Sequence, residues 1–234
     1  MGNLSLASAM LFEPRKAFLE IDAKPRWGFP LLVVILTTVA IALWYRSVVD
    51  LEWVTDRAIR SSSFTANFSE AQIEEAVKRS TSNPTLGMVT TALGTPIAVV
   101  IMGLISALYL LLAGKITGVK RSFGQWFSFT WWVSLPATLL SLLAAAFVLL
   151  TATTAQIDQA DLKPLSLNAL LFQKTFDQSG YTLLSNIDLI QMFSLYLSVV
   201  GVRTWSGRSW LFSSVFALLP YALVYGIWAF ISLR

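Results

Sequence analysis

The chain contains no histidine and no cysteine. The first absence removes the side chain that most often serves as a general acid or base near neutral pH, and the second removes the thiol nucleophile. Together they remove the usual protein ligands for zinc, copper, haem iron and iron–sulfur clusters. We therefore predict no catalytic site, no metal site and no cofactor, and we expect that the protein is not an enzyme.

Charged residues are also scarce. They make up 13% of the 234 residues, against about a quarter in ordinary soluble domains, whereas 56% of the chain is hydrophobic and the mean hydropathy is +0.66. A soluble globular fold is excluded by this composition. The sequence predicts an all-α protein, a polytopic bundle of transmembrane helices in one domain.

Long apolar runs occur five times between polar stretches, and each is long enough to cross the hydrocarbon layer as a helix. Residues 1–29 are predicted to form a cytoplasmic tail with an interfacial helix at 12–22, and residues 30–234 a five-helix transmembrane domain. A second interfacial helix is expected at 164–176. The spans are predicted at about 30–49, 87–116, 126–153, 187–202 and 210–233.

The amino-terminal segment does not read as a signal peptide. Charged residues, among them Glu13, Arg15 and Lys24, interrupt any apolar core before Trp27. The first span is therefore expected to be an uncleaved anchor.

Lysine and arginine counts predict the orientation. With a cytoplasmic amino terminus, the inner segments carry three acids against ten outside and concentrate their bases in much shorter stretches. We therefore expect the carboxyl terminus outside, in a bacterial inner membrane, and a basic cytoplasmic rim that contacts lipid or a partner and no nucleic acid. The predicted contact residues are Arg15, Lys16, Lys24, Arg26, Lys120, Arg121, Arg203 and Arg208.

Prolines lie inside three of the spans, at Pro96, Pro136 and Pro220, and they are expected to bend these helices. Ionisable residues, which usually mark ion or proton pathways, are confined to the span ends. This favours a packing role, but a second interpretation stays open: a small-molecule or lipid transporter whose pathway runs between the three bent spans. A polar cavity at mid-membrane depth would separate the two.

Acidic residues of the first long polar connection allow two interpretations. Ser69 and Gln72 form the pattern of a capping box for a surface helix, with favourable pairs Glu74–Lys78 and Glu75–Arg79. The alternative, a hard-cation site formed by Glu70, Glu74 and Glu75, is less favoured because each acid has a nearby base or solvent as its partner.

Several short stretches together resemble those of the Yip1 family, in its bacterial branch. They are Phe-Glu-Pro-Arg-Lys-Ala-Phe at 12–18, Lys-Pro-Arg-Trp at 24–27, Gly-Val-Lys-Arg-Ser-Phe-Gly at 118–124, Asp-Leu-Ile-Gln-Met-Phe at 188–193, and Ser-Gly-Arg-Ser at 206–209. The resemblance implies five transmembrane helices, a cytoplasmic amino terminus and no enzymatic activity.

The resemblance also bears on partners. Eukaryotic relatives are linked to Rab-type GTPases through an Asp-Leu-Tyr-Gly-Pro motif, which this chain lacks, so GTPase binding is not predicted. For the bacterial branch the resemblance implies accessory partners of membrane complexes such as ABC-type exporters. The leading prediction is a non-enzymatic adaptor or accessory partner of another membrane protein, or a protein of membrane organisation.

Overall fold

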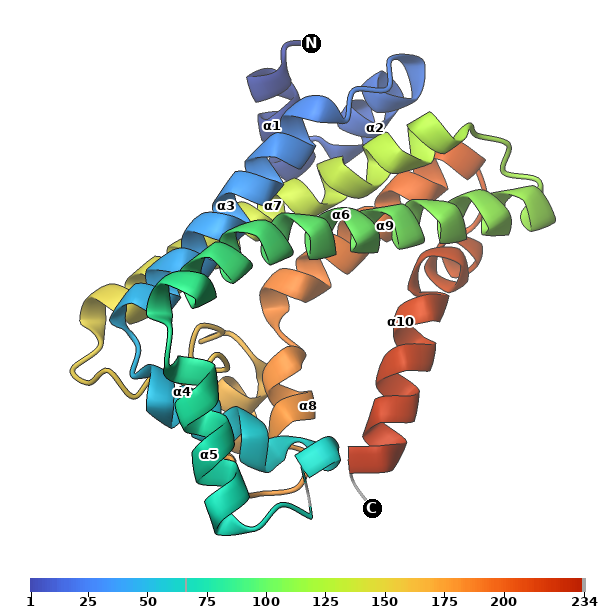
Figure 1. Cartoon of the computed structure of the whole chain (residues 1–234). Coiled ribbons are helices and arrows are strands. Elements are labelled where there is room, and N and C mark those ends of the chain that lie inside the picture. The colour runs from blue at the N-terminus through green and yellow to red at the C-terminus, as the bar shows by residue number, and fades with distance from the viewer. Residues whose placement is uncertain (66, 233–234) are drawn as a thin grey trace.

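Figure 1 shows the computed structural model, which describes residues 1–65 and 67–232; within these ranges the regular structure is entirely helical. The helices are α1 (Asn3–Phe12), α2 (Pro14–Ala23), α3 (Gly28–Val48), α4 (Leu51–Ser61), η1 (Ser63–Thr65), α5 (Glu70–Thr81), α6 (Pro84–Thr117), α7 (Phe123–Thr151), the π-helical turn η2 (Asn168–Phe172), α8 (Tyr181–Asn186), α9 (Leu189–Ser206) and α10 (Trp210–Ser232). The all-helical prediction is confirmed.

Four of the described helices, α3, α6, α7 and α10, are long and apolar enough to cross a membrane. The predicted span at 187–202 corresponds to α9, which has 18 residues but includes Gln191 and Arg203 and is not among these four. The number of five spans therefore stays a prediction. Residue 233, the expected end of the last span, lies outside the described residues.

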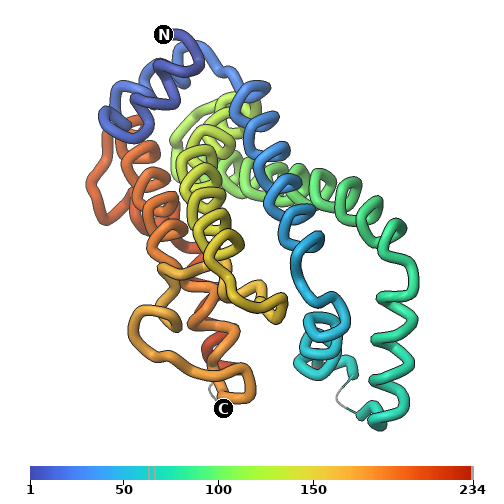
Figure 2. Tube along the Cα trace, turned by 90° about the vertical axis from the view of Figure 1, so that its left-hand side faces the viewer, coloured from blue at the N-terminus to red at the C-terminus, as the bar shows by residue number. Residues whose placement is uncertain are grey.

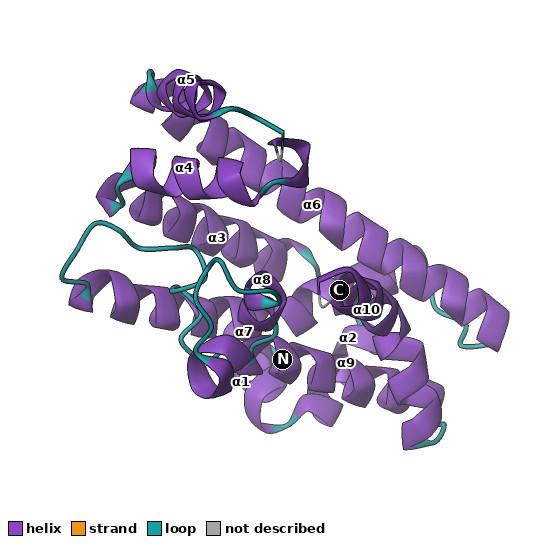
Figure 3. Cartoon of the chain, turned by 90° about the horizontal axis from the view of Figure 1, so that it is seen from below, coloured by secondary structure: helices purple, strands orange, loops and turns teal. Residues whose placement is uncertain are grey.

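The molecule has two distinct ends (Figures 1 and 2). We call the first the basic end; it consists of α1, α2 with the residues that follow it to Arg26, the turn at 118–122, and the turn at 203–209, which includes the last residues of α9. We call the second the loop end; it consists of α4, α5, α8 and the long connection at 152–180. The amino terminus lies at the basic end and the last described turn of α10 at the loop end, which Figure 3 shows from below.

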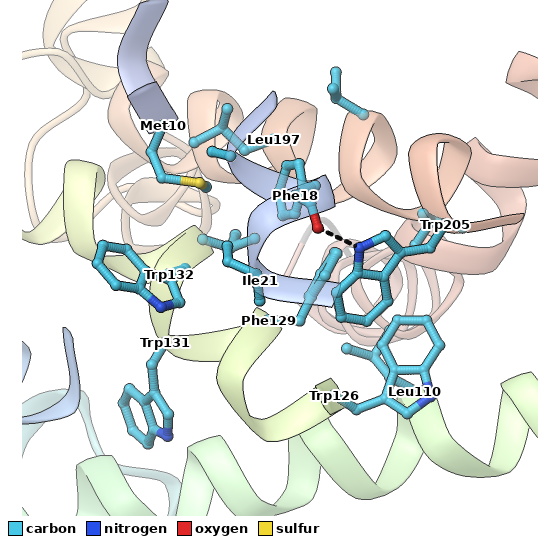
Figure 4. Packing of buried hydrophobic residues seen from close by; sticks show 14 of the residues in the cluster. Met10, Phe18, Ile21, Leu110, Trp126, Phe129, Trp131, Trp132, Leu197 and Trp205 are labelled. Carbon is cyan, nitrogen blue, oxygen red and sulfur yellow. Dashed lines mark hydrogen bonds between the residues drawn. The ribbon is translucent and has the colours of Figure 1, made fainter. Parts of the chain in front are cut away.

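Aromatic side chains fill the interior beside the basic end (Figure 4). Trp126 and Phe129 of α7 pack against Trp205 of α9, with ring centroids 4.9 and 5.0 Å from that of Trp205. Phe18 of α2 lies over Phe129 at a centroid distance of 5.0 Å. Such ring pairs stabilise a core beyond the area that they bury.

The amino-terminal helices belong to this core. Leu6 and Met10 of α1 and Phe18 and Ile21 of α2 are fully buried, whereas Leu19 on the other side of α2 is 59% exposed. The helix expected at 12–22 is therefore present as α2, and its apolar face packs on α7 and α9. Amphipathic spacing identifies an apolar face but does not distinguish a lipid cover from a protein cover.

Close packing at this end depends on one glycine of α9. A Cβ at Gly201 would lie 2.3 Å from the Phe129 ring and 2.6 Å from the Phe18 ring. Any larger side chain here would push the two rings apart, so glycine allows α2 and α7 to approach α9.

Each of the three predicted bending prolines lies inside an uninterrupted helix: Pro96 in α6, Pro136 in α7 and Pro220 in α10. A proline cannot donate to the carbonyl four residues earlier, which for Pro220 is that of Phe216. The hydroxyl of Tyr109 in α6 donates to this carbonyl at 2.6 Å. A neighbouring helix thus satisfies the acceptor that the proline leaves free.

Candidate functional site

The basic end gathers segments that are far apart in the sequence. Arg121, in the turn before α7, donates from Nε and Nη2 to the two carboxylate oxygens of Asp22 at 2.6 and 2.8 Å, and from Nη2 to the Trp205 carbonyl at 3.1 Å. The Trp205 indole donates to the Phe18 carbonyl at 2.8 Å (Figure 4). The amino-terminal helices are thus joined to both basic turns by hydrogen bonds as well as by packing.

All three carboxylates of the basic end are paired. Asp22 holds Arg121, Glu13 pairs with Lys16 at 3.0 Å, and Glu20 pairs with Arg26 at 2.8 Å. Glu20 also accepts from the amino group of Met1 at 2.8 Å. This bond, with a smaller contribution from Arg26, holds the pKa of Glu20 below its usual range.

The remaining cations of the basic end have no acidic partner among the described residues. Arg203 and Arg208 lie over the rings of Trp210 and Phe212 at 4.1 and 4.4 Å. Of the eight predicted contact residues, three are engaged in ion pairs, namely Lys16, Arg26 and Arg121. Five stay available for an external anion: Arg15, Lys24, Lys120, Arg203 and Arg208.

The loop end contains a cavity of about 800 Å³ that no sequence pattern predicted. Its walls come from α3, α4, α6, α7, α8 and the connection at 152–180, and they include three cations, Arg46, Arg57 and Lys163. The cations lie up to 117 positions apart in the chain, so no local spacing could have revealed the cavity.

One ion pair ties α4 to the connection inside this cavity. Arg57 donates from Nε to Asp158 at 3.0 Å, and its guanidinium lies 4.6 Å from the centroid of the Trp53 ring and 3.9 Å from that of Phe176. In the same connection, the Ile157 carbonyl accepts a hydrogen bond from the Tyr45 hydroxyl of α3 at 2.8 Å. The connection is thus anchored to the ends of α3 and α4.

The outer acids do not arrange as expected. Instead of the predicted pairs Glu74–Lys78 and Glu75–Arg79, which are absent from the described ion pairs, Glu70 binds Arg60 of α4 with two bonds of 2.8 and 3.0 Å. Arg60 also pairs with Asp56 of its own helix at 2.8 Å, so Glu70 joins the start of α5 to an ion pair of α4. Arg60 lowers the pKa of Glu70. Within residues 1–65 and 67–232, no group of three or more acids is placed to hold a metal ion. The capping box of Ser69 and Gln72 is present as predicted.

The comparison with protein families identifies the chain. The Yip1 domain matches residues 8–231, from α1 almost to the end of α10. The chain belongs to the Yip1 family. The match covers the basic end, the loop-end connection and all four apolar helices, and so confirms the family resemblance seen in the sequence; placement in the bacterial branch stays a prediction. Neither curated proteins nor solved structures gave a match.

Proposed function

We propose that this Yip1 family member is a non-enzymatic adaptor in the membrane, an accessory partner that binds another membrane protein through the exposed faces of α6 and α10 and through its basic end. The observations that carry the proposal are the low burial of α10 and an apolar face of α6 that stays exposed along the helix. In α10, 11% of the apolar 18-residue stretch is buried, against 22% of the corresponding stretches in α3, α6 and α7.

The exposed face of α6 runs along the whole helix. Its apolar side chains recur every three or four residues, as they do on one side of an α-helix, and each is at least 48% exposed. They are Leu86, Val89, Leu93, Ile97, Ile101, Ile105, Leu108, Leu112 and Ile116. Lipid chains cover such a face in the isolated protein, and helices of a partner replace them in a complex.

Two glycines support close approach by a partner helix. A Cβ at Gly94 of α6 or at Gly226 of α10 would meet nothing within 4 Å. Small residues on a face turned toward the membrane let the backbone of another helix approach closely, whereas contact with lipid chains does not need a small residue there.

The basic end supplies the second contact. Its five available cations come from the amino-terminal helices and both turns, and the aromatic core holds these segments in a fixed arrangement. On the cytoplasmic side such a cluster binds anionic lipid and acidic segments of a partner. We place the amino terminus in the cytoplasm and the protein in a bacterial inner membrane, with a larger complex such as an ABC-type exporter as the class of partner.

The transporter interpretation is not favoured. The aromatic core fills the basic end of the bundle, which is where a pathway from the loop-end cavity would have to continue.

The test is crosslinking of the tagged chain in its native membrane, followed by purification in mild detergent. We expect one recurrent membrane-protein partner that is lost from the triple variant Lys24→Gln, Lys120→Gln and Arg208→Gln. The matched control removes three loop-end charges that form no described ion pair, Lys78→Gln, Arg79→Gln and Lys174→Gln, and should retain the partner. Recovery of no specific protein, together with unchanged membrane morphology on deletion of the gene, would refute the adaptor role.

Orientation has its own test, because the chain has no native cysteine. Single variants Lys120→Cys at the basic end and Glu74→Cys at the loop end are treated with a membrane-impermeant maleimide added outside intact inner membranes. Labelling of Glu74→Cys alone is the expected result, and labelling of Lys120→Cys would reverse the proposed topology.

A further inference from the structure

The loop-end cavity holds two cations that lack an acidic partner. Arg46, in the last turn of α3, makes no hydrogen bond or ion pair within the described residues, and its Nε is buried without an acceptor. Its guanidinium lies against α6, where a Cβ at Gly87 would be 1.9 Å from Nη2. Arg26 at the basic end also has a buried Nε without an acceptor, but its other nitrogens bind Glu20 and the Met1 carbonyl.

Lys163 is the second cation. Its Nζ donates to the neutral amide oxygen of Asn186 at 2.6 Å and to no carboxylate in the described chain. Burial lowers the pKa of Lys163, with Asp188 opposing this effect. A partly buried ammonium group without a direct ion-pair partner carries a desolvation cost, and an anion bound beside it would offset that cost.

The carboxylates in the cavity wall are already engaged. Asp158 binds Arg57, and its Oδ1 accepts from the backbone of Ala160 at 2.9 Å. Asp188 accepts from the Gln191 backbone at 2.8 Å as the N-cap of α9. Neither forms a described ion pair with Arg46 or Lys163, and the three cations of the wall outnumber its two carboxylates.

The rest of the cavity wall extends between the spanning helices. This part of the wall is lined by Thr38, Ile41 and Ala42 of α3 and by Thr91 of α6. The hydroxyls of Thr38 and Thr91 donate to carbonyls of their own helices, at 2.7 and 2.9 Å. This part therefore offers mainly apolar contact, and the two cations line the same cavity. A volume of about 800 Å³ falls within the range of small-molecule sites, about 300–1,000 Å³.

We propose that this cavity binds a phospholipid-like amphiphile whose headgroup carries a net negative charge, with its phosphate held by Arg46 and Lys163 and the start of its apolar chain lying between α3 and α6. Guanidinium and ammonium groups are the side chains that bind phosphate most strongly. An apolar continuation into the bundle distinguishes a lipid-like ligand from free phosphate. This inference is independent of the proposed adaptor role, because the cavity lies at the other end of the molecule from the five available cations.

The experiment uses the purified full chain, stripped of lipid in detergent. Native mass spectrometry measures retention of phosphatidylglycerol against phosphatidylcholine after incubation with mixed micelles of each. A second arm titrates inorganic phosphate and follows the thermal midpoint. We expect one tightly retained phosphatidylglycerol, weaker retention of phosphatidylcholine, and no response to inorganic phosphate at concentrations that saturate the lipid site.

Two variants remove the charges one at a time. Arg46→Gln and Lys163→Gln should each weaken phosphatidylglycerol binding by about tenfold or more, because a hydrogen bond between charged groups is lost. Gly87→Ala is a third variant, which keeps the charge of Arg46 but displaces its guanidinium, and it should weaken binding as well. Lys78→Gln is the matched control; it removes an exposed charge on α5 at the same end, outside the cavity wall, and should bind as the wild type does.

Folding is checked without lipid. Arg46→Gln should keep the thermal midpoint of the wild type, because the side chain makes no bond that stabilises the fold. The proposal is overturned if the two lipids are retained equally, if the Arg46→Gln and Lys163→Gln variants bind like Lys78→Gln, or if inorganic phosphate binds as tightly as the lipid.

Discussion

At the basic end each of three carboxylates pairs with a base and aromatic rings fill the interior, whereas at the loop end a cavity of about 800 Å³ leaves Arg46 and Lys163 without an acidic partner. The same residue types thus serve different purposes at the two ends. Paired charges and close packing fix the amino-terminal helices on the bundle. Unpaired cations around a cavity leave a place for a ligand.

Close packing also holds the cations of the basic end in a fixed arrangement. The five available cations lie on segments that would be independent without the core, namely the amino-terminal helices and two turns. Phe18, Phe129 and Trp205 join these segments, so the relative positions of the charges are set by packing.

The largest expected effect comes from breaking the packing at Gly201. In Gly201→Ala the new methyl group overlaps the Phe18 and Phe129 rings, and we expect a loss of about 1–3 kcal/mol in the free energy of unfolding. The thermal midpoint in one detergent measures this loss. Gly226→Ala is the control on the exposed side of α10, where nothing lies within 4 Å, and its midpoint should stay the same or rise. Equal midpoints for the two variants would contradict the close-packed core.

A second prediction compares one arginine from each end. Arg121→Gln breaks the bidentate bond to Asp22 and should cost about 1–2 kcal/mol, since both side chains are about three-quarters buried. Arg46→Gln breaks no bond and should leave the lipid-free protein as stable as the wild type. Chemical unfolding of the two variants side by side checks the difference. If Arg46→Gln is the more damaging change, the two ends do not differ in the way described.

A third prediction concerns the carbonyl below Pro220. Tyr109→Phe removes the hydroxyl that donates to Phe216 and should cost about 1 kcal/mol. In a Pro220→Ala background the alanine N–H can bind the same carbonyl, so the cost of Tyr109→Phe should be smaller there. A double-mutant cycle of thermal midpoints measures the coupling. Additive effects would show that the hydroxyl does not replace the missing helix bond.

The smallest effect is expected at the exposed ion pair of the loop end. Because Arg60 lowers the pKa of Glu70, the pair stabilises the fold above the usual pKa of glutamate, and this contribution is lost as the pH falls through the lowered pKa. Glu70→Gln should therefore lower the thermal midpoint slightly near pH 7 and leave it unchanged in strong acid. The difference should shrink with added salt, and Glu74→Gln, which breaks no described ion pair, should show no difference at either pH.

The sequence predicted those features that depend on local patterns. Apolar runs placed the four apolar spanning helices within a few residues, and the spacing of Ser69 and Gln72 predicted the start of α5. Charge density grouped Lys120 and Arg208 with the amino-terminal bases, and the structure brings their turns together through Arg121.

Features that depend on contacts between distant segments were not predicted. Helix α1 was missed because its apolar residues recur without a polar face, and its cover, α7, comes more than a hundred residues later. The pair of Arg60 with Glu70 joins two helices, so no spacing within one helix could indicate it. The loop-end cavity combines Arg46 with Lys163 in the same way.

The arrangement of the basic end depends most directly on the docking of α2 into the bundle. A photoreactive phenylalanine analogue, benzoylphenylalanine, placed at position 18 of the chain in its native membrane tests this docking, with Leu19, on the exposed side of the same helix, as the control position. Crosslinks from position 18 to peptides of α7 or α9, and from position 19 to neither, are the predicted result. Crosslinks from position 18 to lipid, with none to the protein, would contradict the account.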